Sequence, residues 1–180
     1  MLVTIIWITV FYASSICYDR DAALRDAFTC VSRALLETNA EHWLVNGSLL
    51  GATRLGHFVL WDGEIDLAFV SESVSTAVSF VQNISDYCSH IGELTRSTLT
   101  DESPGVWKLC SNRVCVELIE YIKKGEDFFS AFGSVSSSAT LPLVTCTLAG
   151  ISTFCPRDGS TYLQHAFGEF WATAPLTSLF

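Results

Sequence analysis

The segment NGSLLGATRLGHFVLWDGEIDLAF, residues 46–69, places three acidic residues at alternate positions after a Gly-Ser pair. Because successive side chains of a strand point to opposite faces, Glu64 and Asp66 should share one face about 7 Å apart, and Asp62 joins them if the turn at Gly63 permits. Like charges held this close raise each other's pKa unless a cation lies between them, and carboxylate oxygens favour Mg²⁺ or Mn²⁺ over zinc. The pattern therefore indicates either a divalent metal site or a solvated acidic strand.

Two further features of this segment suit a phosphate group. Gly47-Ser48 is expected to form a turn into a short helix over residues 48–53, whose exposed backbone N–H groups can bind an anion. Arg54 follows closely enough to donate to the same phosphate, although a surface cation is an equally common role for an arginine. The acids, the turn and the arginine together are more specific than any one of them.

Hydrophobic periodicity predicts the elements on both sides of this segment. We expect helices over residues 18–38, 73–88 and 158–168, and strands over residues 42–45, 58–61, 65–70, 106–110, 114–122 and, as a hairpin, 143–154. Apolar residues occupy both faces of strand 114–122, which predicts a central place in a sheet. Residues between 88 and 106 are expected to form a polar connection, and the Ser-rich residues 133–140 a surface loop.

Length and composition indicate a single globular domain. The chain has 180 residues, of which 49% are hydrophobic, enough to build a core. Its 19 Asp and Glu residues against 10 Lys and Arg give a formal net charge of -9, which argues against the clustered positive charge of a nucleic-acid-binding protein. An anionic substrate would therefore need a local cation.

The N-terminus is apolar until the first charged residue, Asp19. The apolar run from Leu2 to Ala13 has the length of a signal-peptide core and is too short to span a bilayer. We therefore expect residues 1–17 to be a secretory signal peptide, with an uncleaved short membrane anchor or a buried strand as alternatives. Residues 18–180 are expected to form the folded domain.

Seven cysteines indicate an oxidising compartment. Without Cys17 six remain, and we expect disulfides rather than a zinc site because the chain has no CxxC pair. Cys110/Cys115 and Cys146/Cys155 each flank an expected hairpin turn. Six cysteines nevertheless allow about fifteen pairings, and the sequence alone does not choose among them.

The segment 46–69 resembles the LicD and fukutin-related proteins, phosphotransferases of the nucleotidyltransferase superfamily. In that family a Gly-Thr/Ser-Leu-Leu-Gly run leads through an Arg to Trp-Asp-x-Asp-x-Asp. Here residues 47–51 read Gly-Ser-Leu-Leu-Gly, Arg54 follows, and residues 61–66 read Trp-Asp-Gly-Glu-Ile-Asp at the same spacing. Segments near the C-terminus, at residues 155–158 and 162–171, are similar to further family segments, so the resemblance covers roughly residues 25–175.

The resemblance implies an α+β, nucleotidyltransferase-like fold in which a mixed sheet is flanked by helices. It also implies a third carboxylate on a later strand that faces Glu64 and Asp66. Glu117 is the candidate and Glu120 the fallback, and since they lie on opposite faces of one strand, only one of them can face the metal. The sequence departs from the family pattern at Glu64, where Asp is usual, and the longer side chain leaves reduced or lost activity as an alternative.

The family's chemistry implies metal-dependent transfer of a phospho-alcohol, such as phosphocholine or ribitol phosphate, from a CDP-linked donor to a glycan or glycoconjugate. The implied place is the ER or Golgi lumen or the cell exterior. The implied residues are the catalytic carboxylates Glu64, Asp66 and Glu117, the Mg²⁺ or Mn²⁺ ligands Asp62, Glu64, Asp66 and Glu117, and the substrate- and phosphate-binding Gly47, Ser48, Arg54 and Trp61. A nucleotide-binding relative that has lost catalysis and a disulfide-stapled secreted binding module are the alternatives.

Overall fold

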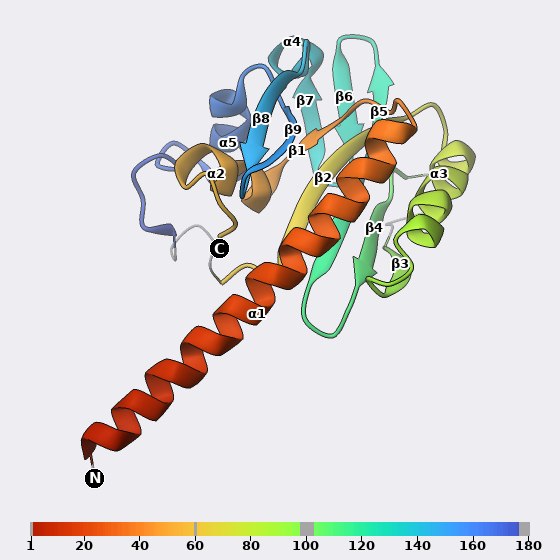
Figure 1. The fold of residues 1–180 in the computed structure, drawn as a ribbon. Helices are drawn as coiled ribbons and strands as arrows, with labels where there is room; N and C mark the ends of the chain where they lie inside the picture. The colour runs from red at the N-terminus through yellow and green to blue at the C-terminus, as the bar shows by residue number, and fades with distance from the viewer. Residues whose placement is uncertain (1, 60, 98–102, 177–180) are drawn as a thin grey trace.

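The computed structural model describes residues 2–59, 61–97 and 103–176 (Figure 1). The helices of the described residues are α1 (Leu2–Glu37), α2 (Asn46–Arg54), α3 (Val74–Tyr87), α4 (Ser137–Thr140) and α5 (Gly159–Phe167). The strands are β1 (His42–Leu44), β2 (Glu64–Ser71), β3 (Glu93–Ser97), β4 (Val106–Cys110), β5 (Cys115–Lys124), β6 (Asp127–Ser130), β7 (Gly133–Ser136), β8 (Val144–Leu148) and β9 (Ile151–Cys155). This content confirms the α+β class.

Seven of the described strands form one mixed sheet. The strand order is β1-β2-β5-β4-β3, and the end of β5 continues into pairing with β6 and then β7. β2 and β5 run parallel, whereas the other pairs in this sheet are antiparallel. Because β5 pairs with β2, β4 and β6, its predicted central place is confirmed. β8 and β9 form a separate hairpin.

α1 lies across one face of the sheet, on the same side as α3 (Figure 1). A helix buries residues that recur three or four positions apart. The core face of α1 includes four large apolar residues spaced in this way, all buried: Leu24, Phe28, Val31 and Leu35. A disulfide between Cys30 and Cys88 fastens α1 to the C-terminal cap of α3.

The helix expected from residue 18 continues toward the N-terminus as far as Leu2. Its first turns project beyond the sheet in Figure 1. Of the helices that the structure describes, none combines the length and the hydropathy needed to cross a bilayer. The division into residues 1–17 and 18–180 stays a prediction.

Helix caps follow the local sequence. Ser73 caps α3, since its side chain accepts from the backbone N–H of Thr76 while its own N–H donates to the Thr76 hydroxyl. Asp158 caps α5 by accepting from the Thr161 N–H at 3.0 Å, and the helix ends at Gly168, whose φ of 80° suits a glycine. These boundaries agree with the predicted helices.

The disulfide prediction is confirmed. The pairs are Cys30–Cys88, Cys110–Cys115 and Cys146–Cys155. The last two join β4 to β5 and β8 to β9, as their hairpin positions suggested.

The strand predicted over residues 58–61 is wrong. Phe58 and Val59 are buried without belonging to a strand, Trp61 lies in a turn, and residue 60 is outside the described residues. β2 is already paired with β1 on one side and β5 on the other, so this segment finds no free edge beside it. Phe58 and Val59 reach the core by side-chain packing alone.

Two segments expected to lack regular structure contain strands. Residues 133–140 form β7 and α4 rather than a loop, because β6 extends the sheet beyond the end of β4 and gives β7 a partner. The connection after α3 contains β3, an edge strand of mostly polar residues with alternating exposure, while residues 98–102 lie outside the described part. Polar edge strands lack the continuous apolar pattern that would have indicated them.

Candidate active site

Three acidic residues converge because β2 and β5 are adjacent parallel strands. Asp66 lies opposite Glu117 in the register, and Glu64, two residues earlier on β2, points to the same side. One carboxylate oxygen from each of the three lies within 4.8 Å of the others. The expected convergence of Glu64, Asp66 and Glu117 is therefore confirmed.

The N-terminus of α2 is fastened to β2 beside these acids. The backbone N–H of Asp66 donates to the Ser48 Oγ at 2.8 Å, and the backbone N–H of Ser48 donates to the Asp66 Oδ2 at 3.3 Å. Ser48 is buried, with 4% of its surface exposed. Its structural role is thus to position Asp66, a role that the sequence did not reveal.

The second glycine of the Gly-Ser-Leu-Leu-Gly run allows a close approach. A Cβ on Gly51 would lie 2.5 Å from the backbone oxygen of His57, which is shorter than any stable contact. Glycine at this position lets α2 pack against the loop that leads to β2. The run therefore joins the start of α2 to β2 through Ser48 and lets the later part of the helix approach the following loop at Gly51.

The three converging acids line a cavity of about 650 Å³, a size typical of substrate sites. Its charged lining consists of four acids and one base: Asp62, Glu64, Asp66, Glu117 and Lys108. Asn46 and Gly47 enter from the start of α2, so Gly47 lies where it was predicted. The remaining lining comes from β3, β4, the β6–β7 turn and α5: Ser97, Val106, Ala131, Phe132, Ala166 and Phe167.

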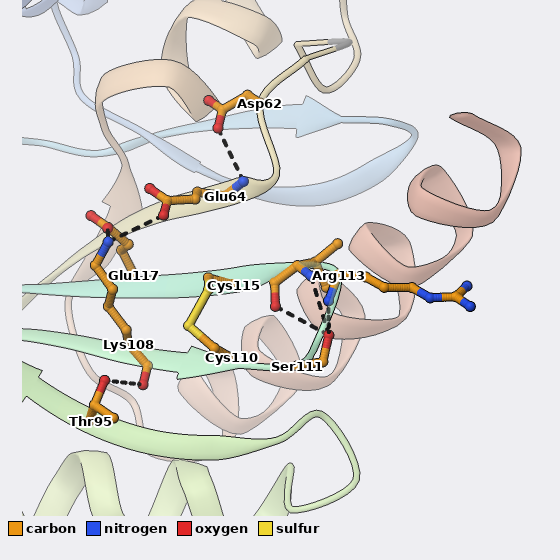
Figure 2. Close-up of a disulfide and its surroundings, with 10 residues drawn as sticks. Asp62, Glu64, Thr95, Lys108, Cys110, Ser111, Arg113, Cys115 and Glu117 are labelled. Carbon is orange, nitrogen blue, oxygen red and sulfur yellow. Dashed lines mark hydrogen bonds and ion pairs between the residues drawn. A yellow bond between two sulfur atoms is a disulfide. The ribbon is translucent and has the colours of Figure 1, made fainter. Parts of the chain in front are cut away.

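Asp62 lies two residues before β2, close to Glu64 (Figure 2). Its Oδ1 accepts from the backbone N–H of Glu64 at 3.1 Å. It lines the same cavity but stands outside the group of three whose ligand atoms meet.

The acids perturb one another because they are crowded and buried. Burial raises the pKa of Asp66 to about 8, and the carboxylates of Asp62 and Glu117 add to the rise. Burial also raises the pKa of Glu117, although the hydrogen bond from Lys108 opposes this. Burial is likewise the main cause of the raised pKa of Asp62.

This donor set fits a divalent cation. The three converging ligands are carboxylate oxygens, which are the preferred ligands of Mg²⁺ and Mn²⁺. Burial, and for Asp66 also the neighbouring carboxylates, raises the pKa of Asp66 and Glu117, so their ionised forms are costly in the metal-free site. A cation among them would supply that charge.

Lys108 is a site residue that the sequence analysis missed. Figure 2 shows its ammonium directed at the acids: the Nζ contacts the Glu117 Oε1 and lies 3.2 Å from the Glu64 Oε1. The available signal was a charged residue in the middle of the apolar strand 106–110, directly opposite Glu117 once β4 and β5 form a hairpin.

Glu120, the fallback for Glu117, faces away from the cavity. It is fully buried, and its two carboxylate oxygens accept from the Ser71 hydroxyl at 2.6 Å and from the Gly105 backbone N–H at 2.7 Å. The expectation that only one of the two glutamates faces the site is confirmed, and it is Glu117.

Arg54 and Trp61 do not join the described lining of the cavity. The Arg54 Nη1 donates to the backbone oxygens of Trp171 and Ala174, both at 3.0 Å, so the guanidinium fixes the C-terminal segment. Trp61 is 42% exposed at the turn before β2. The expectation that these two residues meet the phosphates stays a prediction.

Comparison with known proteins gives the chain a family. The model of the LicD/FKTN/FKRP nucleotidyltransferase domain matches residues 39–158. The ribitol 5-phosphate transferases FKRP of mouse and human are each 30% identical over 86 residues, which is 48% of this chain. The matched segment spans 15% of the length of these relatives.

Solved structures show the same fold. A solution structure of the antibiotic-resistance factor ANT(2'')-Ia superposes with a TM-score of 0.60 at 15% identity, covering 88% of this chain and 80% of that one. A crystal structure of ANT(2")-Ia in complex with adenylyl-2"-tobramycin gives a TM-score of 0.51 at 15% identity, covering 84% and 81%. The expected nucleotidyltransferase-like fold is confirmed. This chain belongs to the LicD/FKTN/FKRP family of nucleotidyltransferase domains.

Proposed function

We propose that this domain transfers a phospho-alcohol, of the phosphocholine or ribitol phosphate type, from a CDP-linked donor to a glycan or glycoconjugate. The observation that carries the proposal is the convergence of Glu64, Asp66 and Glu117 in a cavity of a LicD-family domain. The names of the mouse and human relatives support the class of alcohol.

In this proposal Glu64, Asp66 and Glu117, with Asp62 beside them, hold Mg²⁺ or Mn²⁺. A cation held there would offset negative charge on the donor's diphosphate and on the departing nucleotide. Gly47, at the start of α2, presents its backbone to the phosphates, where a helix N-terminus favours an anion.

The reaction forms one bond and breaks one. The acceptor's hydroxyl oxygen bonds to the phosphorus that carries the alcohol, and the bond from that phosphorus to the bridging oxygen breaks. CMP leaves with the bonding electron pair, and the hydroxyl proton passes to a carboxylate of the cavity acting as general base.

We place this activity in the secretory pathway, in the ER or Golgi lumen or outside the cell. Three disulfides support an oxidising compartment. Attachment to a membrane through the N-terminal segment is part of the same proposal.

A nucleotide-binding relative with weak or absent catalysis is the second candidate. Glu64 stands where the family pattern has Asp, and Lys108 already contacts two of the three converging acids. This candidate retains CDP binding and releases no CMP.

The deciding experiment incubates the full, disulfide-intact chain with Mn²⁺ and a panel of CDP-alcohols that includes CDP-choline and CDP-ribitol, with glycan acceptors, and measures CMP release. Asp66→Asn should lower the rate by at least about a hundredfold, since it removes an anionic ligand. Asp86→Asn, which changes an exposed acid on α3, is the matched control and should leave the rate unchanged. If a folded protein still binds CDP but releases no CMP from any CDP-alcohol of the panel, the second candidate is the correct one.

A further inference from the structure

We propose that Lys108 is a resident cation of this site: its ammonium occupies a cation position between Glu64 and Glu117 until a divalent ion displaces it, and it then binds the donor's diphosphate. The inference rests on the proposed function, because it assigns a role in handling the metal and the donor at the same cavity.

The contacts of Lys108 are those of a bound cation. A single ammonium contacts the Glu117 Oε1 and lies 3.2 Å from the Glu64 Oε1, so it bridges the two strands β2 and β5 from a third, β4. Glu64 and Glu117 are two of the three residues whose ligand atoms converge within 4.8 Å. A divalent ion that uses these oxygens therefore competes with the ammonium for them.

The lysine has room to move after displacement. Its side chain is 36% exposed and lines the cavity, and it carries the ammonium on a flexible four-carbon stem. The Glu64 side chain is 41% exposed, and an ion pair between groups this accessible contributes little to folding. The Glu117 side chain is only 9% exposed, so the contact with Glu117 is the one that a displacing cation must replace with its own charge.

The charge of the cavity explains why the donor needs this lysine. Among the described residues that line the cavity, four are acids and Lys108 is the only lysine or arginine. Arg54, the cation that the sequence suggested for the phosphates, donates instead to the carbonyls of Trp171 and Ala174. Among the described lining residues, Lys108 is therefore the side chain that can offer a positive charge to a diphosphate in this cavity.

A purely structural lysine makes a different prediction. Loss of a structural ion pair would loosen the β4–β5 hairpin and weaken the binding of every ligand. If Lys108 is a resident cation, its removal should strengthen metal binding and weaken diphosphate binding. The acids are then free to bind the metal, whereas the phosphates have lost their positively charged partner.

The experiment compares wild type, Lys108→Met and Lys124→Met as full, oxidised chains by isothermal titration. Lys124 lies at the exposed far end of β5, with its ammonium 5.5 Å from the Phe129 ring centroid, and is the matched control. With Mn²⁺ alone at pH 8, Lys108→Met should bind about tenfold more tightly than wild type, because a competing positive charge is gone. With CDP added at saturating Mn²⁺, Lys108→Met should bind CDP about tenfold more weakly, because a charge-assisted contact is lost.

Lys124→Met should match wild type in both titrations, and Lys108→Arg, which keeps the charge, should bind CDP with wild-type affinity to within about threefold. Far- and near-ultraviolet circular dichroism checks that each variant is folded. Equal Mn²⁺ and CDP affinities in wild type and Lys108→Met would overturn the role of Lys108 and leave the proposed function standing. Weaker binding of both Mn²⁺ and CDP by Lys108→Met would show that the role of the lysine is structural. Folded proteins, wild type included, that bind neither ligand would overturn the proposed function as well.

Discussion

Lowering the pH from 8 to 6 should weaken Mn²⁺ binding about fifty-fold, because Asp66 must lose a proton before it can bind the ion. Burial, followed by the carboxylates of Asp62 and Glu117, raises the pKa of Asp66 to about 8 in the metal-free protein. About half of the Asp66 carboxyl groups are then ionised at pH 8 and about one in a hundred at pH 6, and the ratio gives the fold-change. The dissociation constant should rise by about fivefold as the pH falls from 8 to 7 and by about ninefold as it falls from 7 to 6.

The assay is isothermal titration with Mn²⁺ at pH 6, 7 and 8 in two buffers of different ionisation enthalpy, so that the protons released are counted. We expect about one proton per bound ion at pH 6. Asp66→Asn should bind Mn²⁺ weakly and show less pH dependence, and Asp86→Asn should behave as wild type. A dissociation constant that stays the same from pH 8 to pH 6 in a folded protein would refute the reasoning.

Three further predictions concern stability. In EDTA, the contribution of Asp66 to the free energy of unfolding should fall as the pH rises from about 4 to about 8, by up to ~1.4 kcal/mol per pH unit. The cause is that the native state keeps a proton on Asp66 that the unfolded chain has lost. Urea unfolding at pH 5 and pH 7 measures this fall. Ser48→Ala should lower the unfolding free energy by about 1–3 kcal/mol through the lost partner of the Asp66 N–H, whereas Ser79→Ala on the exposed surface of α3 should change it by less than about 0.5 kcal/mol. Glu120→Ala should lower the free energy of unfolding by about 3 kcal/mol, because it leaves two buried donors without their acceptor, and should leave the Mn²⁺ affinity unchanged. A large loss of Mn²⁺ affinity in a folded variant would contradict the placement of Glu120 on the far face of the sheet.

The sequence predicted the acidic centre because its geometry is local. Glu64 and Asp66 share a face by strand alternation, and the same rule placed Glu117 and Glu120 on opposite faces. The family resemblance then pointed to Glu117 on the later strand. The parallel pairing of β2 with β5 fulfils both expectations at once.

Contacts that sequence reasoning did not foresee depend on long-range register. Lys108 reaches the acids only because β4 and β5 pair so that it stands opposite Glu117. Arg54 stands close to the acids along the chain, yet its hydrogen-bond partners are 117 and 120 residues away, at Trp171 and Ala174. The spacing of residues along the sequence carries no information about contacts between segments so far apart.

The same limit explains the errors in secondary structure. Residues 58–61 have strand composition, but β2 offers no free edge for them. Residues 93–97 have loop composition, yet β4 offers an edge that they fill as β3. Strand formation here follows the availability of a partner as much as local preference.

The Cys30–Cys88 disulfide closes a ring of the chain that contains some of the site residues and leaves others outside. Its ends are 58 residues apart, and the ring they close contains β1, α2 and β2, so Asp66 lies inside it and Glu117 outside. Closing a loop of this length removes disorder from the unfolded chain worth about 4 kcal/mol in the chain-entropy description. A protease cut in a surface loop within the ring would therefore leave both fragments joined, and nicked protein that still runs as one species without reductant should separate into two once the disulfides are reduced.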